Sequence, residues 1–198
     1  MTNRFKLSII SALATCFVLL GVLPAQGQML HQPLDKLVEY STDILVGTIV
    51  SVTDGIDASN VPYTEVTLTV SDALRGALSG RYMFRQFGLI TPRDMGTYTN
   101  LNVTPDGWPR YAEGEEVMLF LYKEAALTGL RTTVGLFQGK FNIVNGQITN
   151  GINNQGLFDN VRAPLSQLSE EEAKLLSTTK GSLPASAFTS LVRKLAGG

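Results

Sequence analysis

Few residues in this sequence have the type and spacing that catalysis requires. His31 is the only histidine, so it is the only base that a Ser–His–Asp triad could use. A general base must be held within hydrogen-bonding distance of its nucleophile. His31 lies close to the predicted start of the exported chain, where chain ends are usually mobile. We therefore predict that His31 takes no part in catalysis.

Two groups of acidic residues have the carboxylates that a metal site or an acid–base pair needs. Asp54 and Asp57 lie in a turn-rich loop that lacks the ligand spacing of an EF-hand. Glu115 and Glu116 are neighbours at the entrance of a predicted strand, so their side chains point to opposite faces. Both groups are interpreted as solvated charges, and we predict no metal ion, no cofactor and no enzyme activity. A hydrolase that uses carboxylates or a Ser–Lys pair remains an alternative.

The most informative group is aromatic and lies in a long segment without periodicity, residues 88–114. Tyr98, Trp108 and Tyr111 occur there beside Arg110 and several prolines. Tyrosine, tryptophan and arginine are typical anchors of binding sites, because they bury a large area with few rotatable bonds. We predict that these four residues contact a ligand. The alternative is that Trp108 folds back and covers the core.

Composition excludes several classes of protein. Apolar residues make up 44% of the chain, which excludes a disordered protein. The formal net charge of −1 makes nucleic acid an improbable partner. The single cysteine excludes a disulfide framework.

The N-terminus has the features of a secretory signal, predicted to span residues 1–27. A basic start at Arg4 and Lys6 precedes an apolar stretch over residues 7–23, and small residues follow at a cleavage site after Gly27. Cleavage after Ala25, an uncleaved membrane anchor and a lipid-modified Cys16 are the alternatives. We predict an exported protein, periplasmic or extracellular, with no membrane span once the signal is removed.

Alternating and β-branched segments predict about six short strands. They cover residues 43–53, 63–73, 81–87, 116–122, 131–137 and 140–144, the last joined by an Asn145-Gly146 turn to 147–149. The segment 116–122 is the most apolar and is predicted to be central. Gly47 within the first strand predicts a bulge or a close backbone approach.

Helices are predicted at both ends of this strand-rich region. One covers residues 33–41, a second begins with a capping box at Ser169 and Glu172 and ends near Lys180-Gly181, and a last one begins at Pro184. We predict a mainly β fold, namely a small antiparallel OB-like barrel over residues 28–165 followed by a helical tail over 166–198.

Three segments resemble a family pattern. The order D-I-x-V-G-x-I, then Y-T-x-V-x-L followed by L-R-G, then G-E-x-V-x-L-F-L occurs over residues 43–49, 63–76 and 114–121. It resembles secreted bacterial proteins with a netrin-like fold, the OB-type barrel of tissue inhibitors of metalloproteases. A later Q-G-x-F segment, Gln138–Phe141, is similar to one in a group of exported bacterial proteins. The resemblance covers roughly residues 34–144.

The resemblance implies a five-stranded barrel with the long segment leading to the fourth strand. Inhibitors of that family chelate zinc through an N-terminal cysteine, which the predicted exported chain lacks, so that mechanism is not carried over. We expect a secreted, non-catalytic binding module for a protein or a glycan. An envelope-associated structural protein that docks through its C-terminal helix is the alternative.

Overall fold

The computed structural model describes residues 31–93, 104–163 and 165–197. The predicted signal segment 1–27, its cleavage site and Tyr98 lie outside these residues. Residues 31–198 form one compact unit, and only this unit is discussed below. In the part of the chain that is described, no helix has the length and apolar character needed to cross a membrane.

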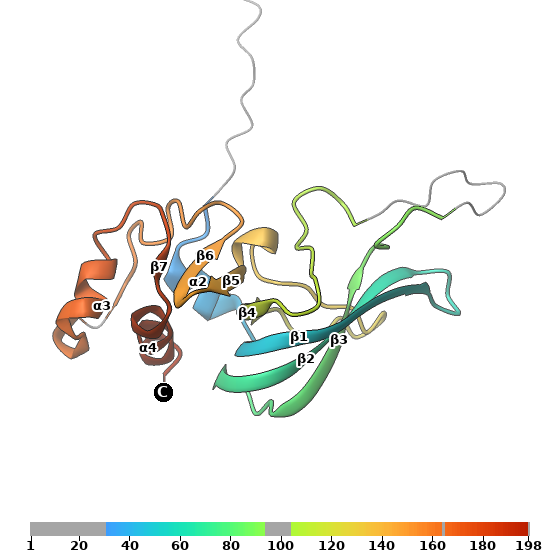
Figure 1. The fold of residues 1–198 in the computed structure, drawn as a ribbon, viewed down its shortest axis with the longest axis horizontal. Helices are drawn as coiled ribbons and strands as arrows, with labels where there is room; N and C mark the ends of the chain where they lie inside the picture. Colours follow the sequence, from blue (N-terminus) through green and yellow to red (C-terminus); the bar gives the residue numbers. More distant parts are fainter. Residues whose placement is uncertain (1–30, 94–103, 164, 198) are drawn as a thin grey trace, which may run out of the picture. The chain divides into compact units, whose positions relative to one another are not determined.

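One antiparallel sheet of seven strands dominates this unit (Figure 1), in the order β3-β2-β1-β4-β5-β6-β7. The strands are β1 (Asp43–Ile56), β2 (Pro62–Arg75), β3 (Gly80–Phe87), β4 (Glu116–Leu121), β5 (Lys140–Val144), β6 (Gln147–Asn150) and β7 (Leu183–Pro184). The mainly β class is confirmed. The sheet is open, however, and not closed into the small barrel of five or six strands that we predicted.

The segment 130–133 links the edge strand β3 to the middle of the sheet through isolated bridges. Leu130 forms a parallel bridge with Arg85 of β3, and Thr133 forms an antiparallel bridge with Leu121 of β4. The predicted strand over 131–137 is wrong, because the chain turns at Gly135 and Leu136, where φ is 65° and 58°. It then enters a short 3-10 helix, η1 (Leu136–Gln138).

β4 is the central strand, as predicted, and its side chains are buried on both faces. Val117 to Leu121 are fully inaccessible to solvent. Alternate residues therefore contribute to two separate cores. The smaller core contains residues from β1 to β4, namely Leu45, Ile49, Val66, Leu68, Phe84, Val117, Leu119 and Leu121. The larger core lies on the other face and includes Met118 and Phe120.

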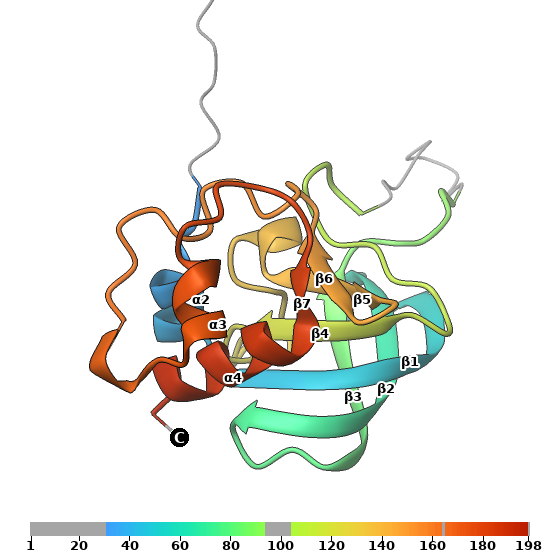
Figure 2. The same cartoon turned by 60° about the vertical axis from the view of Figure 1, so that its left-hand side comes forward.

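Three helices supply much of the larger core. They are α2 (Leu34–Tyr40), α3 (Glu170–Leu175) and α4 (Ala185–Leu195), and a second 3-10 turn, η2 (Leu165–Gln167), precedes α3. Figure 2 shows them gathered near β5–β7, away from β3. Phe141 of β5 lies between Phe120 and Phe188 of α4, with ring centroids 5.5 and 5.2 Å apart. Packed rings of this kind add about 0.5–1.5 kcal/mol per pair to the burial of their area.

The predicted helix over 170–180 is shorter in the structure. Its capping box is present: the Ser169 hydroxyl accepts from the Glu172 amide, and the Glu172 carboxylate accepts from the Ser169 amide. The helix ends at Leu175, because the next amides bond three residues back: Ser177 donates to the Lys174 carbonyl and Thr178 to that of Leu175. Such bonds tighten the last turn into a 3-10 form.

A candidate binding pocket

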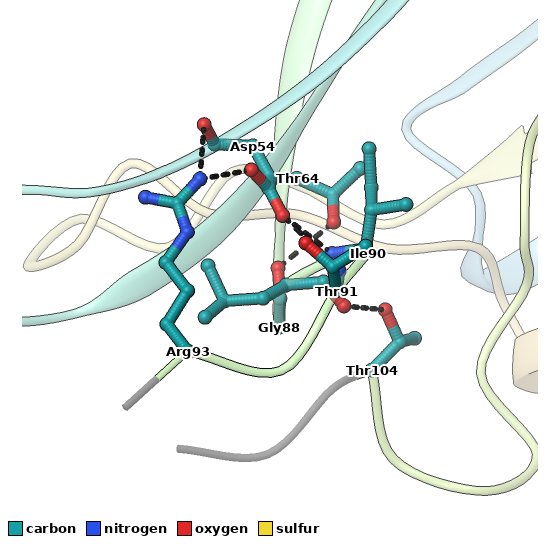
Figure 3. Close-up of polar contacts among 8 residues, drawn as sticks. Asp54, Thr64, Gly88, Ile90, Thr91, Arg93 and Thr104 are labelled. Carbon is teal, nitrogen blue, oxygen red and sulfur yellow. Dashed lines mark hydrogen bonds and ion pairs between the residues drawn. The ribbon is translucent and has the colours of Figure 1, made fainter. Parts of the chain in front are cut away.

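A buried carboxylate fixes the chain that follows β3. Asp54 lies near the end of β1, and its side chain is only 10% exposed. One of its oxygens accepts hydrogen bonds from the amides of Ile90 (2.8 Å) and Thr91 (3.4 Å), and the other forms an ion pair with Arg93 (Figure 3). Because backbone amides and a guanidinium share this carboxylate, residues 90–93 are held against the end of β1.

Two threonines also bond the chain that follows β3, through its carbonyl groups. The Thr64 hydroxyl of β2 donates to the Gly88 carbonyl at 2.8 Å, and the Thr104 hydroxyl donates to the Leu89 carbonyl at 3.2 Å (Figure 3). Gly88 has a φ of +107°, and a Cβ there would lie 2.6 Å from the Thr104 Cα. Only glycine permits this approach, which brings residues 88–90 against Thr104.

The segment that returns to β4 is held by a buried lysine. Lys140, from the Q-G-K-F segment, donates to the Glu115 carboxylate and the Arg110 carbonyl, each at 2.7 Å. Its ammonium lies 5.2 Å from the centre of the Tyr111 ring, and Phe84 of β3 packs edge-on against the same ring at 5.7 Å. A cation over the face and an aromatic edge leave that ring little freedom to move.

These contacts enclose a small pocket on the face of the sheet that carries the smaller core. Its volume is about 140 Å³. Val52 of β1, Thr64 of β2 and Gln86 of β3 line it from the sheet, whereas Ile90, Thr104, Arg110 and Tyr111 line it from the connection between β3 and β4. Both apolar and hydrogen-bonding groups are therefore present on its wall.

Two buried polar atoms on residues of this pocket have no hydrogen-bond partner within the described ranges. They are the Gln86 side-chain oxygen and the Tyr111 hydroxyl. Gln86 is 1% exposed, and its Nε2 donates to the Pro109 carbonyl at 2.9 Å, which fixes the orientation of the amide. A buried polar group without a partner is costly, and such groups often mark a place that a ligand or water completes.

Burial raises the pKa of the Tyr111 hydroxyl well above its ordinary value, and the nearby Glu115 charge acts in the same direction. The phenol therefore keeps its proton at any physiological pH and remains a neutral donor. Gln86 has no charge to lose. The Gln86 and Tyr111 side chains are thus neutral, and Arg110 carries the one charge among the described residues that line the pocket.

The structure brings together two of the four residues predicted to contact a ligand. Arg110 and Tyr111 line the pocket. Trp108 does not; it is half-buried and packs against Phe87, with ring centroids 6.2 Å apart. Tyr98 lies outside the described residues. Binding by any of these residues remains a prediction.

Sequence reasoning missed Gln86 and Thr64. Both stand at inward positions of their strands: Gln86 follows Tyr82 and Phe84 in the alternation of β3, and Thr64 precedes Val66 in that of β2. A polar residue where the alternation requires an apolar one is a detectable signal of an internal polar site.

The Asp57 and Glu115 carboxylates are engaged in internal contacts. Asp57 accepts from the amides of Ser59 and Val61, which closes a turn. The Glu115 carboxylate pairs with Lys140. Among the described residues, no three His, Cys, Asp or Glu side chains are grouped to hold a metal ion.

Changing Tyr111 to phenylalanine tests whether the Tyr111 hydroxyl contributes to the stability of the folded protein. The change removes a buried group that lacks a protein partner, so we expect the free energy of unfolding to stay level or to rise by up to about 1 kcal/mol. Urea unfolding measures this. Tyr82→Phe is the matched control, because the Tyr82 hydroxyl bonds Arg131 and its loss destabilises the protein. A loss above about 1 kcal/mol in Tyr111→Phe would show that the hydroxyl has a structural partner.

Comparisons with protein-family models, with curated proteins and with solved structures found no match to this chain. The netrin-like resemblance therefore remains a prediction from the sequence.

Proposed function

We propose that the chain is a non-catalytic module that binds a protein partner outside the cytoplasm, through the pocket between β3 and residues 104–111. The observation that carries the proposal is the pair of buried polar atoms, on Gln86 and Tyr111, that have no partner among the described residues of a built pocket. The export signal predicted over residues 1–27 supplies the location.

The size of the pocket favours a protein over a free small molecule. Pockets that enclose a whole small ligand have volumes of about 300–1,000 Å³. At about 140 Å³, this pocket has room for a single side chain or a fragment of similar size. A partner that inserts one side chain needs further contacts around the pocket to bind tightly.

Residues suited to such contacts line the pocket or lie near its lining residues in the sequence. Ile90 is 47% exposed and Phe87 is 37% exposed, and Phe87 packs against the half-buried Trp108. Arg110 is exposed. Aromatic residues and arginine are enriched in protein interfaces, where a few of them contribute most of the binding energy.

The structural alternative, docking through the C-terminal helix, has less support. Phe188, Leu191 and Val192 of α4 are fully buried in the larger core of the same chain. The apolar face of that helix is therefore occupied. The hydrolase alternative gains no support either, because the carboxylates of Asp54 and Glu115 are held in internal ion pairs.

Changing Trp108 to alanine tests the proposed surface. We expect the variant to bind its partner at least about tenfold more weakly, because truncating an aromatic anchor at an interface typically costs 1–2 kcal/mol or more. The partner is first captured on the tagged protein from envelope and secreted fractions of the source cell and identified. Its dissociation constant is then measured for each purified variant.

Tyr40→Ala is the matched control, because Tyr40 is an exposed aromatic residue on α2 and does not line the pocket. Unchanged affinity in the control and weaker affinity in Trp108→Ala would support the proposed surface. Equal affinity in both variants would place the binding surface elsewhere and contradict the proposal.

A further inference from the structure

Part of the sheet edge formed by β3 is unpaired. The Gly88 amide donates to β2 at 3.1 Å, whereas the Arg85 carbonyl accepts from the Arg131 amide, on the opposite side of the strand, at 2.8 Å. Because backbone groups alternate between the two sides of a strand, those of Arg81 and Met83 also point away from β2. Within the described ranges, the amides and carbonyls of these two residues have no hydrogen-bond partner. Such an edge is a template for pairing with another extended chain.

The unpaired stretch is long enough for a short strand. Proteins usually protect the edges of a sheet by shortening or covering the edge strand, and the other edge strand, β7, has only two residues. At β3, Leu130 bridges Arg85, but no described residue forms a bridge with residues 80–84 on that side. Arg81 is exposed, and Met83 is 49% exposed. Residues 80–84 therefore offer an accessible edge of a length common among strands.

The side chains at this edge define what an added segment must carry. Arg81 and Met83 lie two positions apart in β3, so their side chains share one face of the sheet. Arg81 forms no ion pair within the described part of the chain, whereas the Arg85 guanidinium pairs with Glu65 at 2.8 Å. In an added strand, each residue lies directly opposite one residue of β3. An acidic residue there would meet Arg81, and an apolar residue two positions away would meet Met83.

A second copy of this chain fits the edge less well. Since the edge is covered at Arg85, two β3 strands can overlap only over residues 80–84, which centres the pairing on Tyr82. Each Arg81 would then lie opposite a Met83 of the other copy, so both cations would stay unpaired. Charge complementarity therefore favours a different chain that brings a carboxylate.

We propose that residues 80–84 form a docking edge for an extended segment of another protein, in which an apolar residue is followed two positions later by an acidic one. The segment adds antiparallel to β3, because antiparallel pairs are slightly more stable than parallel ones. Backbone hydrogen bonds supply the affinity and the two side chains supply the specificity, as in other cases of strand addition. The docking edge is separate from the pocket, so this inference goes beyond the proposed function and does not depend on it.

The capped peptide Thr-Val-Thr-Glu-Thr is the probe, since its valine would lie opposite Met83 and its glutamate opposite Arg81. We expect a titration followed by ¹⁵N NMR to shift the backbone amides of both residues and to saturate in the millimolar range. Replacing the glutamate of the peptide with lysine should weaken binding about two- to fivefold, the range of one exposed ion pair. In Arg81→Glu, we expect the lysine peptide to bind more tightly than the glutamate peptide.

N-methylated peptides test the backbone pairing directly. Methyl groups on the valine and glutamate amides remove the two donors that face β3, so we expect binding at least about tenfold weaker. A methyl group on the central threonine amide is the matched control, because that amide points away from β3 and should leave affinity unchanged. Met83→Pro removes a donor from the docking edge where proline is tolerated, and should also weaken binding. The peptides and Arg81→Glu keep the test valid if Met83→Pro fails to fold.

Trp108→Ala is expected to bind the peptide normally, because Trp108 packs against Phe87 beyond the docking edge. Absence of shifts at Arg81 and Met83, or equal affinity of the differently N-methylated peptides, would overturn the proposal. Weaker binding in Trp108→Ala would place the peptide on the surface near the pocket and would also overturn it. Shifts of the β3 amides on dilution of the protein alone would overturn it in favour of a second copy.

Discussion

Replacing Arg131 with methionine is expected to lower the free energy of unfolding by about 3–5 kcal/mol, because it would leave the charged Asp43 carboxylate buried without a partner. The Arg131 side chain is 7% exposed and forms an ion pair of 2.6 Å with Asp43 of β1, itself only 14% exposed. The same guanidinium donates to the Tyr82 hydroxyl of β3 and, at 2.9 Å, to the Tyr122 carbonyl beyond β4. One side chain therefore connects β1, β3 and the chain that follows β4.

Urea unfolding of the variants measures this loss. Arg193→Met is the matched control, since Arg193 pairs with Asp72 where both side chains are well exposed, and such pairs contribute about 0–1 kcal/mol. In Asp43→Asn combined with Arg131→Met, we expect part of the loss to be recovered, because no uncompensated charge remains. A loss in Arg131→Met no larger than that in Arg193→Met would show that the buried pair does not hold the sheet.

Replacing Glu172 with alanine is expected to lower the free energy of unfolding by about 2–3 kcal/mol, because three hydrogen bonds to a buried carboxylate are lost. Glu172 is 2% exposed. It accepts from the Lys194 ammonium and the Ser190 hydroxyl, each at 2.6 Å, and from the Ser169 amide at 2.7 Å. These bonds join the start of α3 to α4. Urea unfolding at neutral pH measures the loss.

The same carboxylate makes stability depend on acidity. Hydrogen bonds from Lys194, Ser190 and the Ser169 amide lower the pKa of Glu172 from 4.5 to about 2. The stabilisation is therefore complete above the ordinary pKa of about 4.5 and is lost as the pH falls toward 2. We expect stability to decline less steeply across that interval in Glu172→Gln than in the unmodified protein. Glu171→Gln is the control, because Glu171 is the exposed neighbour of Glu172. If stability changed with pH identically in all three proteins, Glu172 would not be the source of the pH dependence.

Local patterns predicted the features that depend on a few neighbouring residues. The Asn145-Gly146 turn has positive φ at both positions, 51° and 73°, as a type I′ turn requires. At Gly47 the register of β1 against β2 shifts, and a Cβ would lie 2.5 Å from the Thr69 carbonyl oxygen. The capping box of α3 was also predicted from the sequence and is present in the structure. In each case the physical cause lies within the local sequence or in one strand pairing.

Features that depend on distant partners were not predicted. The sequence of residues 131–137 predicts a strand, yet Arg131 bonds β1, β3 and Tyr122 beyond β4, and the chain turns at Gly135. β7 has only two residues, Leu183 and Pro184, and owes its place to pairing with β6. Local periodicity cannot predict such contacts, because they form only once the sheet has assembled.

The candidate site also contains residues that the sequence predicted and residues that it did not. Residue type alone pointed to Arg110 and Tyr111, because such side chains are common binding anchors. Gln86 was missed, since its significance comes from burial among residues brought together from β1, β2 and the β3–β4 connection. Tyr111 belongs to the pocket for a further reason that sequence does not contain: Lys140, from a segment 29 positions later, holds its ring in place.

The contribution of α4 to the larger core has a consequence for folding during synthesis. Leu34 and Leu37 of α2 share that core with Phe188 and Leu191 of α4, near the two ends of the described chain. Until α4 has been synthesised, α2 has no completed core on which to pack. Contacts so distant in sequence also slow folding, because a long loop must close before they form. The larger core is therefore complete only once α4 is present, and until then the Met118 and Phe120 side chains of β4 lack part of their covering.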